Sequence, residues 1–123
     1  MAKLNDDARD NGLQQITDRV DEIHICSQEP TTFTEASSTY TLGNKTSPTI
    51  SAPQDGDTNG RKVEASAFSD GSVTATGTAT HWAWVDTVNS ILYATEALSS
   101  SQSVTSGNTF SLDAHAATIP DAA

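Results

Sequence analysis

The chain has 123 residues and a formal net charge of −10, from 16 acidic and 6 basic residues. That length fits one small domain, and the negative charge argues against binding to nucleic-acid phosphates or to an anionic membrane. The lone Cys26 excludes an internal disulfide, no apolar run reaches the length of a membrane span, and the polar start "MAKLNDDARD" predicts no secretory signal. We therefore expect a protein kept in a cytoplasm or assembled into a particle there.

Residues suited to a hydrophobic core are scarce. Leu, Ile, Val and Phe make up 21 of the 123 residues, a share that with high net charge favours disorder. Segments that alternate cleanly between apolar and polar residues oppose that interpretation, because a disordered chain has no reason to keep them. The sequence predicts a folded but lean domain that gains part of its stability from a partner.

The first expected element is a helix over residues 4–21. Leu13, Ile16 and Val20 recur at helical spacing, and Asn5 is suited to cap the first turn. Two interpretations of the apolar stripe stay open. The helix covers the protein's own sheet, or it docks on a neighbouring molecule.

The rest of the chain reads as short strands separated by turns. A first strand is expected over 22–27, followed by a long irregular region over 28–60 with a short strand at 39–44. Asp70-Gly71 is a hairpin-turn signal, and Pro120 is expected to stop the last strand. Further turns are expected at 88–90 and 106–108, and further strands at 60–68, 72–79, 80–87, 91–97, 109–114 and 115–119.

This spacing predicts a mainly β fold, an antiparallel β-sandwich or barrel-like meander with one N-terminal α-helix. The predicted organisation has two parts: an N-terminal helix or arm over 1–21, and a β domain over 22–123 that carries the extended loop 28–60.

Both tryptophans lie in "THWAWVDT", where Trp82 and Trp84 share one face of the expected strand. The opposite face is also apolar, which indicates a strand covered on both sides. We predict that the two indoles form the core with three further side chains, Val85, Phe110 and Leu112. The alternatives are a partner interface or an exposed platform that stacks sugars.

No residue group predicts catalysis. "DGDTNG" supplies Asp55, Asp57 and Asn59 at the spacing of a calcium loop. However, the twelfth position is Ser66 in place of glutamate, so a plain turn is the competing interpretation. The three histidines fall on different expected strands, and no serine lies in a nucleophile elbow. We expect no enzyme activity, no cofactor and no small-molecule substrate.

The segments "ICSQEP", "LGNK", "ISAPQDGDTNGRKV", "DGSVTATGTATHWAWVDT", "ALSSSQSVTSGNTFSLDA" and "IPD" span residues 25–121. They resemble a family of small virion proteins from tailed bacteriophages and prophages. The resemblance implies a structural particle component of the head-decoration (cement) type, which sits on the outer capsid surface and bridges major capsid protein subunits. Related small phage proteins serve in necks and tails, so that location is the alternative.

A decoration role implies contacts with the major capsid protein and with copies of the chain itself. The candidate contact residues are large apolar groups outside the regular meander that begins at Arg61: Leu4, Leu13, Phe33 and Tyr40. For each of them, burial on the protein's own sheet is the alternative.

Overall fold

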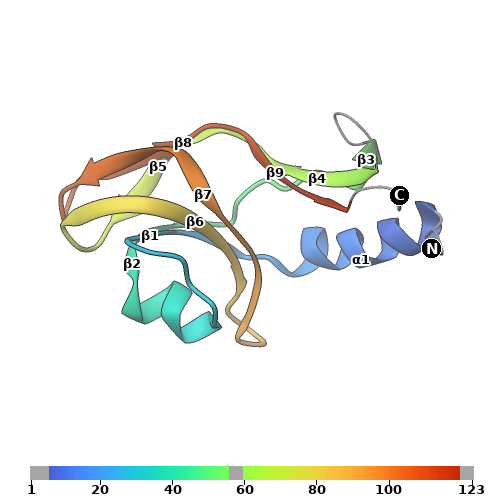
Figure 1. The fold of residues 1–123 in the computed structure, drawn as a ribbon, viewed down its shortest axis with the longest axis horizontal. Coiled ribbons are helices and arrows are strands. Elements are labelled where there is room, and N and C mark those ends of the chain that lie inside the picture. Colours follow the sequence, from blue (N-terminus) through green and yellow to red (C-terminus); the bar gives the residue numbers. More distant parts are fainter. Residues whose placement is uncertain (1–5, 56–59, 120–123) are drawn as a thin grey trace. The chain divides into compact units, whose positions relative to one another are not determined.

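A computed structural model describes residues 6–55 and 60–119 of the chain. It confirms a mainly β fold with antiparallel pairing and a single N-terminal α-helix (Figure 1). The described residues group into two compact units that interleave along the sequence.

The first unit contains α1 (Asp6–Arg19), β3 (Gln54–Asp55), β4 (Arg61–Ala65) and β9 (His115–Ile119), with strand order β3-β4-β9. Helix α1 contacts β4, and Thr17 Oγ1 donates a hydrogen bond to the Ser51 carbonyl oxygen at 2.7 Å. The helix is thus part of a unit with three strands. This grouping differs from the expected division into a helical arm and one β domain.

The second unit is a six-stranded sheet of order β7-β6-β1-β2-β5-β8. Gln102 Nε2 in β7 donates to the Ser111 carbonyl oxygen in β8 at 3.3 Å. This bond joins the two edge strands, so the sheet curls toward a barrel, as predicted. The order is not a simple meander, because β1 and β2 lie between β6 and β5. The elements are β1 (Glu22–Cys26), the π-helical turn η1 (Glu35–Thr39), β2 (Thr41–Thr46), β5 (Phe68–Val73), β6 (Gly77–Asp86), β7 (Ile91–Val104) and β8 (Thr109–Leu112).

The core of this sheet is built where β1 pairs with β6. Ile23 lies opposite Trp84 and Ile25 opposite Trp82, and the two indole centroids are 5.1 Å apart. Both faces of β6 are covered, as the apolar alternation predicts. The burial expected of the five core residues is confirmed, with exposed fractions of 5% or less for Trp82, Trp84, Val85, Phe110 and Leu112.

The predicted turn at Asp70-Gly71 is wrong, because both residues lie inside β5. Gly71 pairs with Phe110 of β8, and a Cβ on Gly71 would lie 2.5 Å from Cζ of the Phe110 ring. The glycine is therefore needed for close packing under an aromatic ring and not for a reversal. Asp70 accepts a 3.0 Å bond from Lys45 Nζ, and this bond lowers the pKa of the Asp70 carboxyl.

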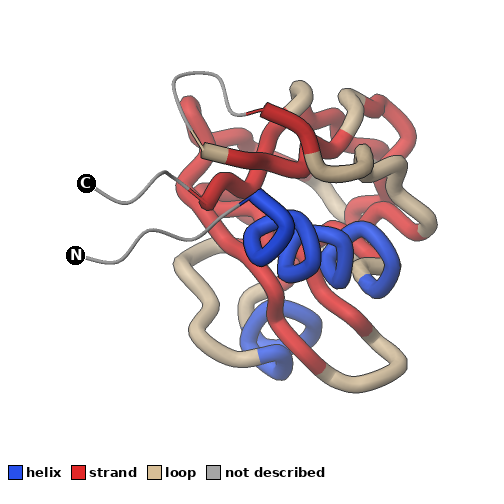
Figure 2. The backbone as a smooth tube through the Cα atoms, turned by 90° about the vertical axis from the view of Figure 1, so that its right-hand side faces the viewer, coloured by secondary structure: helices blue, strands red, loops and turns tan. Residues whose placement is uncertain are grey.

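The region expected to be irregular apart from a short strand at 39–44, residues 28–60, contains η1, β2 and β3, and β2 overlaps that expected strand. Figure 2 shows η1 as the shorter of the two helical segments, beside the strands. Glu35 fixes the start of this turn. Its Oε1 accepts bonds from the Thr31 amide and the Thr31 hydroxyl, both at 2.8 Å, while its own amide donates to Thr32 Oγ1 at 3.1 Å. This arrangement is close to a capping box.

Candidate partner-contact site

The turn between β6 and β7, residues 87–90, exposes an apolar side chain to solvent. Val88 is 84% exposed and Ile91, at the start of β7, is 38% exposed. Ser90 adopts a positive φ of 58°, a conformation that costs free energy for a residue with a Cβ. We name residues 87–91 the β6–β7 tip.

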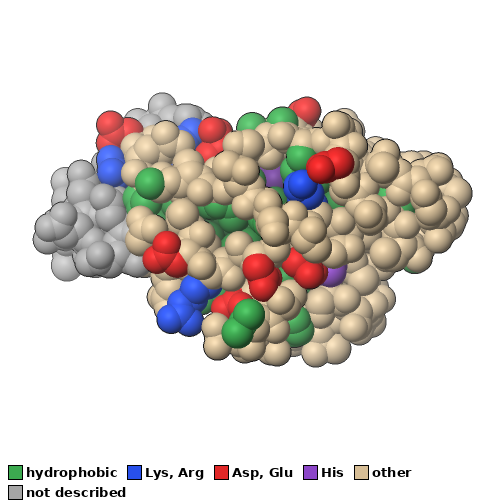
Figure 3. Space-filling view, turned by 180° about the vertical axis from the view of Figure 1, so that it is seen from behind, with side chains coloured by type: hydrophobic (Ala, Val, Ile, Leu, Met, Phe, Trp, Pro, Cys, Tyr) green, Lys and Arg blue, Asp and Glu red, His purple; other side chains and the backbone are tan. Residues whose placement is uncertain are grey.

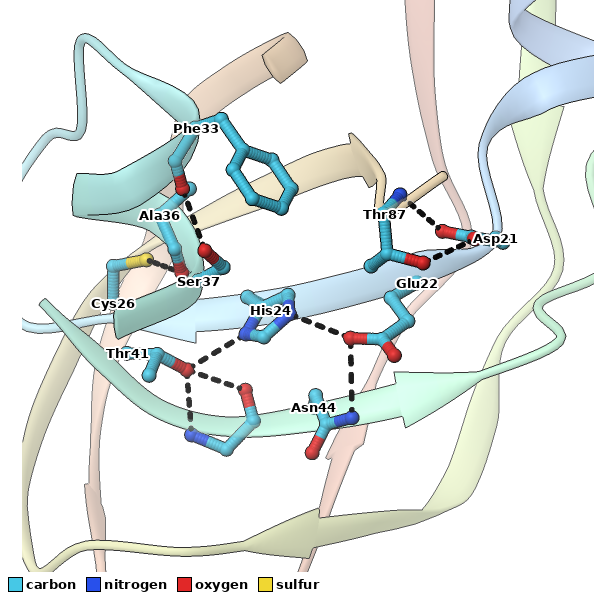
Figure 4. Close-up of polar contacts among 11 residues, drawn as sticks. Asp21, Glu22, His24, Cys26, Phe33, Ala36, Ser37, Thr41, Asn44 and Thr87 are labelled. Carbon is cyan, nitrogen blue, oxygen red and sulfur yellow. Dashed lines mark hydrogen bonds and ion pairs between the residues drawn. The ribbon is translucent and has the colours of Figure 1, made fainter. Parts of the chain in front are cut away.

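Two carboxylates hold the tip in one conformation. Asp86 is 2% exposed, and its oxygens accept bonds from the Val88 amide at 2.9 Å, the Asn89 amide at 3.2 Å and Asn89 Nδ2 at 2.7 Å. Asp21, which precedes β1, accepts from the Thr87 amide at 3.0 Å and from the Thr87 hydroxyl at 2.6 Å (Figure 4). Hydrogen bonds to charged acceptors are the stronger kind, so these bonds favour one conformation of the tip.

A buried polar cluster lies on β1 and β2 of the same unit (Figure 4). His24 is 5% exposed. Its Nε2 lies 2.8 Å from Glu22 Oε1 and its Nδ1 lies 2.8 Å from Thr41 Oγ1. Asn44 Nδ2 donates to the same Glu22 oxygen at 3.4 Å. Every nitrogen of the imidazole therefore has a partner, as a buried polar group requires.

Burial lowers the pKa of His24, although the bond to Glu22 opposes this shift. The ring is therefore neutral at neutral pH. We assign the proton to Nε2, which donates to the Glu22 carboxylate, while Nδ1 accepts from the Thr41 hydroxyl. The opposite tautomer would set a nitrogen lone pair against the carboxylate.

A hydroxyl, an imidazole and a carboxylate in this order are also the parts of an activated nucleophile. Here the imidazole is 5% exposed, and Thr41 Oγ1, which donates its one proton to His24 Nδ1, accepts from the Gly43 amide at 3.3 Å. The bond from Gly43 ties the hydroxyl to its own strand. The hydrogen bonds of the cluster join side chains of β1 to side chains of β2.

Next to this cluster, η1 packs on the sheet through small side chains. Cys26 Sγ donates to the Ala36 carbonyl oxygen at 3.6 Å, and both residues are 0% exposed. Burial raises the pKa of the Cys26 thiol to about 12, so the thiol is unreactive at neutral pH. Phe33 and Tyr40 are half-buried and pack against the same group of residues, which also includes Ala83 and Val85.

The structure separates the four contact residues predicted from the sequence. Leu13 is 1% exposed, which agrees with the alternative of a helix that covers its own strands. Phe33 and Tyr40 are half-buried and help to attach η1 to the sheet. Leu4 lies outside the described residues. None of the three described side chains matches the exposure of Val88.

The candidate calcium loop falls mostly outside the described residues, since Asp57 and Asn59 lie there. Asp55 is described, and its carboxylate accepts a bond from Arg61 Nη1 at 2.6 Å. This ion pair joins β3 to β4. Within residues 6–55 and 60–119, no group of three His, Cys, Asp or Glu side chains has an arrangement that could hold a metal ion.

Sequence reasoning missed the tip and the His24 cluster. A local pattern indicates one partner in each case. Asp86 directly precedes a turn, and Glu22 and His24, two residues apart, share one face of their strand. The other partners, Asp21 for the tip and Thr41 for His24, come from distant parts of the chain. No local pattern indicates those contacts.

In the view of Figure 3, the charged side chains are scattered among backbone atoms and other side chains. Among the described elements, no helix has the length and apolar character needed to cross a membrane. Scans of protein-family models, of curated proteins and of solved structures found no match to this chain.

Proposed function

We propose that the protein is a structural component of a tailed-phage virion that decorates the capsid shell and stabilises it by bridging major capsid protein subunits. The sequence resemblance over residues 25–121 suggests the virion. The observation that carries the proposal of a binding role is the β6–β7 tip, where Val88 is 84% exposed on a turn held by two carboxylates.

A rigid turn suits a protein that binds in many copies. Because the tip is already ordered, docking costs little conformational entropy. Burying one valine side chain contributes about 1.5–3 kcal/mol, which corresponds to roughly a tenfold to hundredfold change in affinity. One such contact is weak alone. Each bound copy adds its own contribution to the stability of the shell.

The structure bears differently on the two alternatives. A tail or neck protein would use the same kind of contact, so the structure does not distinguish it from a decoration protein. The number of copies per particle does. A carbohydrate-binding module requires exposed aromatic faces, whereas Trp82 is 5% exposed and Trp84 is 0% exposed. We therefore favour a virion structural role over a sugar-binding role.

The first test is the copy number of the protein in purified particles, measured by quantitative mass spectrometry against the major shell protein. A simple fraction of the shell protein's number supports decoration. A handful of copies assigns the protein to the neck or tail, and complete absence from particles refutes a virion role.

The second test uses particles that lack the protein, incubated with wild-type protein or a variant. We expect Val88→Asp to weaken shell binding at least tenfold, because a buried unpaired carboxylate opposes docking. Thr105→Asp is the matched control, since it adds the same charge at an exposed position in another turn of the unit. Equal binding by the two variants would remove Val88 from the contact.

A further inference from the structure

Strand β7 forms one edge of the six-stranded sheet. It pairs with β6 on one side, and within the described residues it makes no backbone–backbone hydrogen bond to any other segment. The pairing with β6 is regular from Ile91 to Ala97 apart from one register shift near Leu92. Over this stretch, the outer side of β7 presents a row of backbone N–H and C=O groups.

Few of the features that normally block such an edge are present. Proteins protect edge strands with lysine, proline, inward charges or bulges. Residues 91–97 contain no proline and no lysine, and Glu96 is their only charge. One bulge lies within this stretch, between Leu92 and Ala94, and a larger irregularity lies further on. There, Ala79 of β6 pairs with Gln102 of β7, but His81 pairs with Ala97. The β7 residues between Ala97 and Gln102 therefore form an irregular segment, and the regular edge ends at Ala97.

Charge indicates what binds this edge. The chain carries a net charge of −10, yet Glu96 is the only charged residue between Thr87 and Leu112. Copies of so acidic a chain repel one another over most of their surface. They can approach through a nearly neutral strand, whereas a basic partner would be drawn to the acidic parts of the chain.

We propose that residues 91–97 of β7 pair with the same residues of a second copy, antiparallel and about a twofold axis, so that two six-stranded sheets become one. An isologous contact of this kind uses the same patch on both molecules. The ladder supplies the main-chain bonds that each edge lacks, as in recognition by strand addition.

The position of Glu96 restricts the register. Pairing centred on Glu96 would set two carboxylates directly opposite one another, which is destabilising. Pairing centred on Ala94 sets Glu96 opposite Leu92 of the other copy and Tyr93 opposite Thr95. That register brings an aromatic side chain against a β-branched one, which is a favourable cross-strand pair.

The test is the solution mass of the isolated full chain by sedimentation equilibrium across a wide concentration range. One chain has a mass of 12.9 kDa, and we expect the wild type to reach twice that mass. Ala97→Glu adds a second carboxylate to the exposed edge, and we expect it to raise the dimer dissociation constant at least tenfold. Ala114→Glu, at an exposed position outside the strands, is the matched control and should dimerise like the wild type.

Hydrogen exchange locates the contact. We expect amides in residues 91–97 to gain protection as protein concentration rises, and circular dichroism checks that Ala97→Glu remains folded. A wild type that stays monomeric, a dimer unaffected by Ala97→Glu, or concentration-dependent protection confined to other strands would each overturn the proposal. These measurements need no virion, so their failure leaves the proposed decoration role to be judged by copy number.

Discussion

Replacing Gly71 with alanine tests the packing of Phe110 on β5. The backbone of Gly71 is not at a positive φ, so alanine fits the local conformation. The new Cβ would lie 2.5 Å from Cζ and 2.7 Å from Cδ1 of the Phe110 ring. Phe110 is 4% exposed, and its ring packs edge-on against Phe68 with centroids 5.6 Å apart. The ring therefore has little room to move.

Overpacking of a core typically costs about 1–3 kcal/mol, and we expect Gly71→Ala to lower the free energy of unfolding by that amount. The assay is urea unfolding followed by tryptophan fluorescence, because Trp82 and Trp84 are buried in the same unit. Gly77→Ala is the matched control. Its Cβ would meet only the Leu42 side chain, with the nearest methyl carbons at 3.1 and 3.4 Å, a looser contact than the one at Gly71, so we expect a smaller loss than for Gly71→Ala.

A double variant separates the clash from other effects of the substitution. Phe110→Leu removes the ring, so Gly71→Ala should cost less in that background than in the wild type. If Gly71→Ala were as stable as Gly77→Ala, or if Phe110→Leu left its cost unchanged, the argument that Gly71 is required under the ring would be refuted.

Two further predictions concern the buried polar groups. Because burial lowers the folded-state pKa of His24 below its ordinary value of 6.5, the folded state binds fewer protons than the unfolded state. The stability that His24 contributes is therefore fully present above about pH 6.5 and is lost as pH falls through the lower folded-state pKa. Urea midpoints measured from about pH 7.5 to about pH 5.5 should fall in the wild type and change less in His24→Gln, with His81→Gln as the control. An equal slope in all three proteins would contradict this. In the wild type, the Asp86 carboxylate accepts from the Val88 amide and from Asn89 Nδ2. Asp86→Asn replaces one of its oxygens with an NH2 group, which cannot accept, and we expect the free energy of unfolding to fall by about 1–3 kcal/mol. Asp55→Asn, which removes only a surface ion pair, should change stability by less than about 1 kcal/mol, and equal losses would show that the bonds to Asp86 do not stabilise the turn.

Local patterns in the sequence were sufficient to predict the class of the fold and much of its core. Apolar residues at every second position identify which face of a strand is buried, because side chains alternate across a strand. This rule placed Trp82 and Trp84 in the core with Phe110 and Leu112, and all four are buried. The helix was also predicted, from the spacing of Leu13 and Ile16, although it ends at Arg19, before Val20.

Glycine was interpreted wrongly where its role depended on a distant residue. Asp70-Gly71 has the local form of a turn, but the space above Gly71 is filled by Phe110 from a strand far along the chain. The strand order had the same difficulty. Nothing local indicates that β1 inserts beside β6, since pairing is decided by which faces bury one another.

The sequence by itself determined that the fold is mainly β, which faces are apolar, and that one nearly neutral stretch follows Thr87 in an acidic chain. Only the tertiary structure decided where that stretch lies in the fold. It placed β7 at the edge of the sheet, and it brought Asp21 to Thr87, 66 residues away, to fix the exposed tip. The physical reason is that side-chain alternation is a local property of the chain, whereas strand pairing and hydrogen-bond partners depend on contacts between residues far apart in sequence.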